Sequence, residues 1–258
     1  MRVAKGGHKI TTVSEWFEHA PPKGGLSQWK DGRSAKECAV SWLAGSSVGA
    51  PAEVHALVSS HRDFGRVSYL SAEPEVKLPF DKLRGEVRNA DLVVEAQDER
   101  GRFALTIETK ADEAFGETVA EALSAAVERR LENERSRGSE RIRDLCLSLF
   151  RPAANGEPKL GGLRYQLLTA TSGTLAHASR IGASRAVLII QEFVTSKTTD
   201  ARHEANGEDL DRFIRRLSQG AVVHCAAGTL AGPFEIPGAP LFKSPAVFYV
   251  GKAVRNLR

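Results

Sequence analysis

Hydrophobic residues alternate with polar or small residues in two neighbouring stretches of this chain. In residues 91–96 the apolar Leu92, Val94 and Ala96 fall at every second position, and residues 103–110 repeat the pattern from Phe103. A period of two is typical of strands that bury one face. Between the stretches, Asp98-Glu99-Arg100-Gly101 has the Asp-first, Gly-last composition of a tight turn. We therefore expect a β-hairpin here.

Elsewhere the spacing of apolar residues is mostly helical. It predicts helices over 34–44, 52–59, 116–133, 139–150, 163–181 and 207–219. Further strands are expected over 66–78 (interrupted by Pro74), over the continuous apolar run 186–193 and near 246–254. The order of elements predicts an α/β fold, with a central mixed β-sheet flanked by α-helices.

The N-terminal 31 residues have a different composition. The sequence HAPPKGGLSQWKDGRS is rich in Pro, Gly and polar residues, which predicts an irregular N-terminal arm over 1–31. The remainder, 32–258, is short enough to fold as a single domain around one core. A capping-box spacing from Ser34 to Glu37 predicts that Ser34 is the N-cap of the first helix of this domain.

Composition places the chain among soluble globular proteins. The charged fraction is 26%, and no stretch has the length or apolarity of a membrane span. The N-terminus lacks the apolar region of a secretion signal, and three scattered cysteines fit a reducing compartment, so we expect a cytoplasmic protein without a membrane partner. A net charge of +4 permits a polyanionic partner without requiring one.

The second strand of the hairpin ends in charged residues. Glu108 and Lys110 are two positions apart on a strand, so they share a face. A carboxylate there can hold a hard cation such as Mg²⁺ (or Mn²⁺). The neighbouring ammonium can orient or deprotonate a water, or stabilise negative charge that develops on a phosphate.

Asp91 opens the first strand of the hairpin. If the loop has an even number of residues centred on Glu99 and Arg100, Asp91 lies directly opposite Glu108, with Cβ atoms roughly 5 Å apart. Two carboxylates at this distance repel unless a cation lies between them, which predicts a metal. A three-residue loop with a glycine bulge is the alternative, and it would turn Asp91 to the other face.

The Glu-x-Lys pattern alone is weak, because it occurs three times. Glu75-Val76-Lys77 is flanked by prolines, and Glu157-Pro158-Lys159 lies in a Pro/Gly-rich segment. Only Glu108-Thr109-Lys110 follows an apolar strand and has an upstream strand that begins with an acid. An inert ion-pair cluster of Asp91, Glu108 and Lys110 is the alternative interpretation.

Asp91 followed seventeen residues later by Glu108-x-Lys110 resembles the catalytic signature of the PD-(D/E)XK nuclease superfamily. RNADLVV is similar to that superfamily's frequent entry to its second core strand, although Asn89 and Ala90 stand where a proline is common. WKDGRSAKECAVSWL and KADEAFG are similar to uncharacterised bacterial proteins of the same superfamily. The order of elements over roughly 30–195 also matches.

The resemblance implies a restriction-endonuclease-like fold and Mg²⁺-dependent (or Mn²⁺-dependent) hydrolysis of phosphodiester bonds. Carried over to this chain, Asp91 and Glu108 would be metal ligands, the Thr109 carbonyl a third ligand and Lys110 the catalytic lysine. The expected substrate is nucleic acid, with DNA preferred over RNA.

Two further residues are candidates for the same site. Glu37 would be contributed by the first core helix, although a capping-box role accounts for it at least as well. Gln166 opens the helix over 163–181, whose small residues would allow close approach to the sheet. The alternative for Gln166 is an ordinary polar residue near a helix start.

Six arginines lie between residues 129 and 143, interleaved with three glutamates. They can follow a phosphate backbone, but a salt-bridged solvent-facing surface is the preferred interpretation. The alternative to an enzyme is a nuclease-like module that binds nucleic acid or a protein without turnover. A structural or oligomeric protein ranks third, and the sequence leaves the oligomeric state open, a homodimer included.

Overall fold

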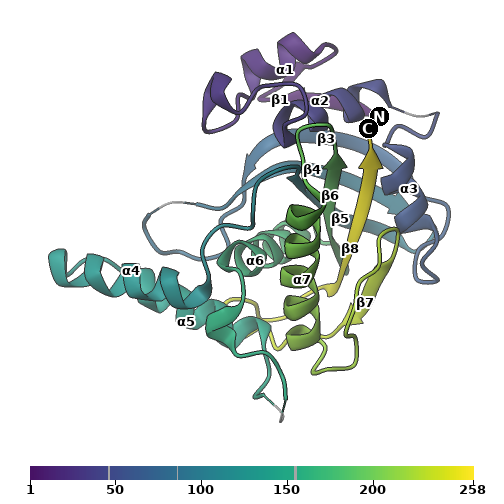
Figure 1. Cartoon of the computed structure of the whole chain (residues 1–258). Coiled ribbons are helices and arrows are strands. Elements are labelled where there is room, and N and C mark those ends of the chain that lie inside the picture. Colours follow the sequence, from purple (N-terminus) through teal and green to yellow (C-terminus); the bar gives the residue numbers. More distant parts are fainter. Residues whose placement is uncertain (46, 86, 154–155) are drawn as a thin grey trace.

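The central sheet of this protein contains both parallel and antiparallel strands. A computed structural model describes residues 1–45, 47–85, 87–153 and 156–258, and these residues form an eight-stranded sheet in the order β2-β1-β3-β4-β5-β6-β8-β7 (Figure 1). The strands are β1 (Arg2–Lys5), β2 (His8–Lys9), β3 (Ser68–Lys77), β4 (Asn89–Asp98), β5 (Gly101–Lys110), β6 (Arg185–Val194), β7 (Leu230–Phe234) and β8 (Val247–Asn256). The predicted fold class, a mixed sheet flanked by helices, is confirmed.

Helices cover both faces of this sheet (Figure 1). They are α1 (Val13–His19), α2 (Ser34–Ala44), α3 (Ala52–Ser59), α4 (Val119–Glu132), α5 (Gly138–Leu149), α6 (Tyr165–Arg180) and α7 (Asp200–Leu217). The α2 and α3 helices pack with one apolar face of the sheet, whereas α4 to α7 belong to the core on the other face. No helix in the described ranges is long and apolar enough to cross a membrane.

The hairpin of β4 and β5 has the register that an even-numbered loop requires. Asp98 pairs with Gly101, which leaves Glu99 and Arg100 as the loop, and the ladder continues to Leu92 opposite Ile107. Its next position aligns Asp91 with Glu108. The three-residue alternative is therefore wrong.

Two parallel strands extend the sheet beyond this hairpin. The β5 strand pairs with β6, and β6 pairs in turn with β8. Nine of the ten residues of β6 are buried, as its continuous apolar run predicts. The β5 strand is therefore an interior strand of the sheet, and Glu108 and Lys110 stand at its carboxyl end, where pairing continues only with β6.

The expectation of an irregular arm over 1–31 is wrong in part. The β1 strand pairs in parallel with β3, and α1 begins with a capping box of Thr12 and Glu15. Trp16 is buried in the core on the α2 and α3 face. The Pro- and Gly-rich part after α1 holds only a short 3₁₀ turn, Gly25–Ser27, so composition predicted that part correctly.

Three boundary expectations also require correction. Pro74 does not interrupt β3, because it stands opposite Leu92 within the ladder to β4. The α2 helix has Arg33 as its N-cap, without a side-chain capping bond, in place of Ser34. The α7 helix begins at Asp200, seven residues before the expected start, because the side chain of Thr199 caps it.

Candidate functional site

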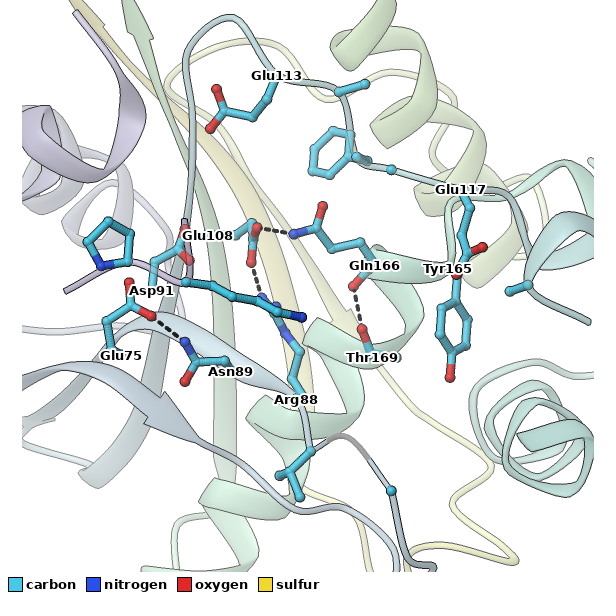
Figure 2. Close-up of a pocket in the computed structure, with 18 of the residues that line it drawn as sticks. Glu75, Arg88, Asn89, Asp91, Glu108, Glu113, Glu117, Tyr165, Gln166 and Thr169 are labelled. Atoms are coloured by element: carbon cyan, nitrogen blue, oxygen red, sulfur yellow. Dashed lines mark hydrogen bonds and ion pairs between the residues drawn. The ribbon is translucent and has the colours of Figure 1, made fainter. Parts of the chain in front are cut away.

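A cavity of about 1310 Å³ opens where β3, β4 and β5 end. Its walls come from the segment that follows α1, from the ends of these strands, from α6 and from the helical pair α4 and α5. Asp91, Glu108, Thr109, Lys110 and Gln166, five of the residues expected at the site, line this cavity. Figure 2 shows the acidic and amide side chains that point into it.

Glu108 is the residue at the centre of the site. It is only 1% exposed, and its Oε1 accepts hydrogen bonds from Lys110 Nζ at 3.0 Å and from Gln166 Nε2. Its Oε2 accepts from the Arg88 guanidinium. Burial raises the pKa of Glu108, but the charges of Arg88 and Lys110 outweigh burial and hold that pKa below its ordinary value. Glu108 is therefore ionised at neutral pH.

Asp91 is held by the strand that follows it in the sheet. The β4–β5 ladder ends at Leu92 and Ile107, and beyond it the amide and hydroxyl of Thr109 donate to Asp91 Oδ2, each at 2.7 Å. Burial, together with the charge of Glu108, raises the pKa of Asp91 to about 6. Asp91 Oδ1 accepts no hydrogen bond from the described residues, so this oxygen is free to meet a ligand.

Lys110 lies beside both carboxylates. Burial lowers its pKa, but the charges of Glu108 and Asp91 outweigh burial and raise that pKa above the ordinary value. Its ammonium also lies 5.1 Å from the centroid of the Phe115 ring. Lys110 is therefore protonated at neutral pH, which leaves it available as a positive charge and a hydrogen-bond donor.

Glu75 is a site residue that the sequence did not reveal. Pro74 pairs with Leu92 and Val76 pairs with Ala90, so Glu75 is aligned with Asp91 on the neighbouring strand. Its backbone has φ of 51°, a conformation that residues other than glycine seldom adopt. Its carboxylate accepts a hydrogen bond from Asn89 (Figure 2). Burial and the charge of Asp91 raise the pKa of Glu75 to about 8.

Arg88 is the second residue that sequence reasoning missed. It precedes β4 and forms an ion pair with Glu108. The helix α6 can approach it closely because residue 173 is glycine: a Cβ there would lie 3.4 Å from Arg88 Cγ and 3.2 Å from Leu78 Cβ. Arg88 is the first residue of the RNADLVV stretch, and this was the sequence signal that could have identified it.

Gln166 and Glu37, the two helix-borne candidates, have different positions. Gln166 lies on the first turn of α6 and contacts Glu108, so the expected approach of this helix is confirmed. Glu37 does not line the cavity. Its carboxylate accepts the amide of Gly32 at 2.7 Å, so it holds the turn before α2.

The donor atoms at the site suit a hard divalent cation. Within the described residues, no group of three or more His, Cys, Asp or Glu side chains has an arrangement that holds a metal ion. Asp91 and Glu108 nevertheless offer carboxylate oxygens, the ligands that Mg²⁺ prefers. The raised pKa values of Asp91 and Glu75 indicate an excess of negative charge, which a bound cation would relieve. The ligand role of the Thr109 carbonyl stays a prediction.

Basic residues surround this acidic floor. Among the described residues that line the cavity are nine Lys or Arg and five Asp or Glu. Part of the Arg-rich segment pairs as expected, since Arg137 contacts Glu140 and Arg143 contacts Asp144. Arg129 and Arg135 have no such partner among the described residues, and both line the cavity, as Arg137 also does. The interpretation of this segment as only a salt-bridged surface is therefore incomplete.

Comparisons with known proteins give one match. A family model described as a domain of unknown function (DUF6946) matches residues 9–244. No curated protein and no solved structure matches the chain. The functional argument therefore depends on the site itself.

Proposed function

Since the chain belongs to the DUF6946 family, a domain of unknown function, we propose from its site that it hydrolyses phosphodiester bonds of nucleic acid, with DNA as the expected substrate, in a Mg²⁺- or Mn²⁺-dependent reaction. A PD-(D/E)XK-like site would carry this activity. The proposal includes a cytoplasmic location.

A single observation carries the proposal: Asp91, Glu108 and Lys110 meet at the floor of one cavity. Glu108 and Lys110 contact each other directly, and Asp91 is close enough for the charge of Glu108 to raise its pKa. The three residues come from adjacent strands of a hairpin whose register aligns the two acids. A surface ion pair needs no such cavity, whereas a hydrolytic site does.

Asp91 and Glu108 would hold the cation. When bound, it would polarise the phosphate and supply an activated water. Asp91 can offer Oδ1, because the Thr109 amide and hydroxyl occupy Oδ2. Glu108 uses three hydrogen bonds of the about four that a carboxylate can accept, which leaves one lone pair on Oε2.

The other residues of the site act on charge and position. The protonated Lys110 would donate to a phosphate oxygen and stabilise the negative charge that develops there. Arg88 and Gln166 would keep Glu108 ionised and oriented. These roles assign Lys110 an electrostatic function and not that of a general base.

The test is cleavage by the purified protein with Mg²⁺ or Mn²⁺ on a panel of single- and double-stranded DNA and RNA. We expect cleavage of DNA, and we expect Lys110→Ala to reduce its rate by about 100-fold or more while the fold stays intact. Asp91→Ala and Glu108→Ala should abolish Mn²⁺ binding measured by calorimetry as well as cleavage.

Lys77→Ala is the matched control, because Lys77 is the exposed lysine of another Glu-x-Lys sequence on β3. It should cleave as the wild type does. Absence of cleavage across the whole panel, with either metal, would refute the proposed activity.

A nuclease-like binding module without turnover is the second candidate function. The observation that favours it concerns Glu108, which is almost fully buried. Its carboxylate oxygens already accept hydrogen bonds from Lys110, Gln166 and Arg88 and so offer little room for a metal ion. Calorimetry distinguishes the two candidates. Nucleic-acid binding without any Mn²⁺ binding would select the module over the enzyme.

A further inference from the structure

The helices α4 and α5 form a helical hairpin (residues 119–149) that projects from the body of the molecule (Figure 1). They pack against each other through small residues, since a Cβ at Gly138 would lie 3.0 Å from Ala126 Cβ. Their hydrophobic residues at the base, Ala122, Ile142 and Leu145, join the core that also contains α6. One side of this hairpin forms a wall of the cavity.

The arginines of this hairpin fall into two groups, those that line the cavity and those that do not. Arg129, Arg135, Arg137 and Arg141 line the cavity, whereas Arg130 and Arg143 do not. The α4 helix has its buried face at Ala122 and Ala126, and Arg129 lies three residues beyond Ala126, on the side next to that face. The arginines toward the cavity are therefore a selected subset of the segment.

No contact among the described residues explains why Arg129 and Arg135 line the cavity. Both are exposed, and their side chains form no ion pair or hydrogen bond with any residue that the structure describes. Arg84, on the loop between β3 and β4, also lines the cavity and is equally unpaired within the described ranges. Exposed guanidinium groups without a carboxylate partner are suited to phosphate oxygens.

Charge is separated within the cavity. The acids Glu75, Asp91 and Glu108 lie at the strand ends, and the unpaired arginines lie toward the hairpin and the β3–β4 loop. The other two acids of the lining, Glu113 and Glu117, lie on the segment between β5 and α4. An acidic floor suits a cation, and a basic wall suits the anionic backbone of a polymer. A small anionic ligand would use the arginines near the floor and would leave Arg135, just beyond the end of α4, without a function.

We propose that the cavity-facing side of the helical hairpin, through Arg129 and Arg135, binds the phosphate backbone of a nucleic-acid strand and directs it toward Asp91, Glu108 and Lys110. This inference rests on the proposed function for the identity of its ligand. The binding itself requires neither the metal nor turnover.

The experiment measures fluorescence anisotropy of short labelled single-stranded DNA, duplex DNA and single-stranded RNA with the full chain, in EDTA so that no cleavage occurs. Affinity is followed between about 50 and 200 mM salt. The variant is Arg129→Ala combined with Arg135→Ala. Its matched control is Arg130→Ala combined with Arg143→Ala, which removes the same charge from positions of the hairpin that do not line the cavity.

The wild type should bind at least one of these probes. We expect the Arg129→Ala, Arg135→Ala variant to bind more weakly than the wild type. For duplex DNA, the magnitude of its slope of log affinity against log salt should be smaller by about two. The control variant should keep most of that slope, and circular dichroism should show unchanged helix content in both. Equal losses in the two variants, unchanged binding in the first or no binding by the wild type would overturn the inference.

Failure of this inference and failure of the proposed activity give different results. A wild type that cleaves DNA while its binding is insensitive to Arg129 and Arg135 would retain the activity and reject the role of the hairpin. A wild type that binds through these arginines but never cleaves would retain the role of the hairpin and reject the activity.

Discussion

The carboxylates of Glu75, Asp91 and Glu108 meet near the ends of the β3–β4 and β4–β5 ladders, where burial makes their negative charge costly unless it is balanced. Glu108 is balanced by Arg88 and Lys110. Glu75 receives a hydrogen bond from the neutral Asn89, and Asp91 receives two from Thr109. Glu75 and Asp91 therefore carry the unbalanced charge of the site, as their raised pKa values indicate.

This imbalance predicts how stability depends on pH. The folded pKa of Glu75 is about 8, above its ordinary value of 4.5, so the folded state binds more protons than the unfolded state between these values. The free energy of unfolding should therefore fall as the pH rises through this window, with Asp91 adding to the loss up to about pH 6.

In Glu75→Gln, the free energy of unfolding should fall much less above pH 6 than it does in the wild type. Urea unfolding in EDTA at several pH values measures this free energy. Glu73→Gln, on the same strand and half exposed, is the control and should retain the wild-type dependence. An unchanged pH dependence in Glu75→Gln would show that Glu75 is not the titrating group.

At the scale of elements, the β4–β5 turn is tied to β6 by a buried ion pair. Asp98 forms two hydrogen bonds with the Arg185 guanidinium, at 2.5 and 2.7 Å, and its side chain is fully buried. The Arg185 guanidinium also lies 5.0 and 5.3 Å from the ring centroids of Phe64 and Phe103. The pair holds the end of the hairpin opposite to the site and so supports the register that aligns Asp91 with Glu108.

Asp98→Ala should lower the free energy of unfolding by about 3 kcal/mol, because it leaves the buried charge of Arg185 without its carboxylate counter-ion, with only the carbonyls of Asp63 and Gly101 as acceptors. The hydrogen bond from Arg185 lowers the pKa of Asp98 to about 2, so its stabilisation is present above pH 4 and is lost as the pH falls toward 2. Denaturant unfolding measures both effects.

Two variants complete this test. Asp98→Leu combined with Arg185→Met should recover part of the loss, since it removes both charges. Asp144→Ala, which breaks the exposed pair with Arg143, should cost less than about 1 kcal/mol. Equal costs for the buried and the exposed pair would contradict the anchoring role.

At the scale of the whole molecule, the cavity joins segments that are distant along the chain. Its walls include the arm at Lys23, the β3 strand at Glu75, the helical hairpin at Arg135 and α6 at Gln166. A cation that binds the folded site and not the unfolded chain should therefore stabilise the protein as a unit.

We expect Mn²⁺ at about 100 times its dissociation constant to add about 2.7 kcal/mol to the free energy of unfolding. The stabilisation should be larger at pH 8 than at pH 6, because Asp91, with a pKa of about 6, must be ionised to bind. Thermal or denaturant unfolding with and without Mn²⁺ measures it.

Asp91→Asn should lose this stabilisation, and Glu73→Gln should keep it. NaCl at matched ionic strength provides the control for screening. A midpoint that rises equally in Asp91→Asn and in the wild type would place the cation elsewhere on the molecule.

The sequence by itself determined most of the helices and strands after residue 31, including the two strands that carry Asp91 and Glu108, but not β1, β2, α1 or β7. The bounds of α2 and α3 agree with their helical spacing, and β4 and β5 agree with their period of two. Because both periodicities are local, they need no information about the rest of the chain. The alignment of Asp91 with Glu108 depends on a local feature, the length of one turn, for which the sequence left two alternatives and the register of the hairpin decided.

Tertiary structure alone decided which other residues join Asp91 and Glu108 at the site. Glu75 became a neighbour of Asp91 through the register of β3 with β4, and Arg88 reached Glu108 beside Gly173 of α6. Glu37 had a suitable residue type in a suitable helix, yet its carboxylate holds Gly32. Likewise, only the packing of α4 against α5 separated the cavity-facing arginines from the others. The physical reason is that periodicity specifies which face of an element is apolar, whereas long-range packing selects the polar groups that meet.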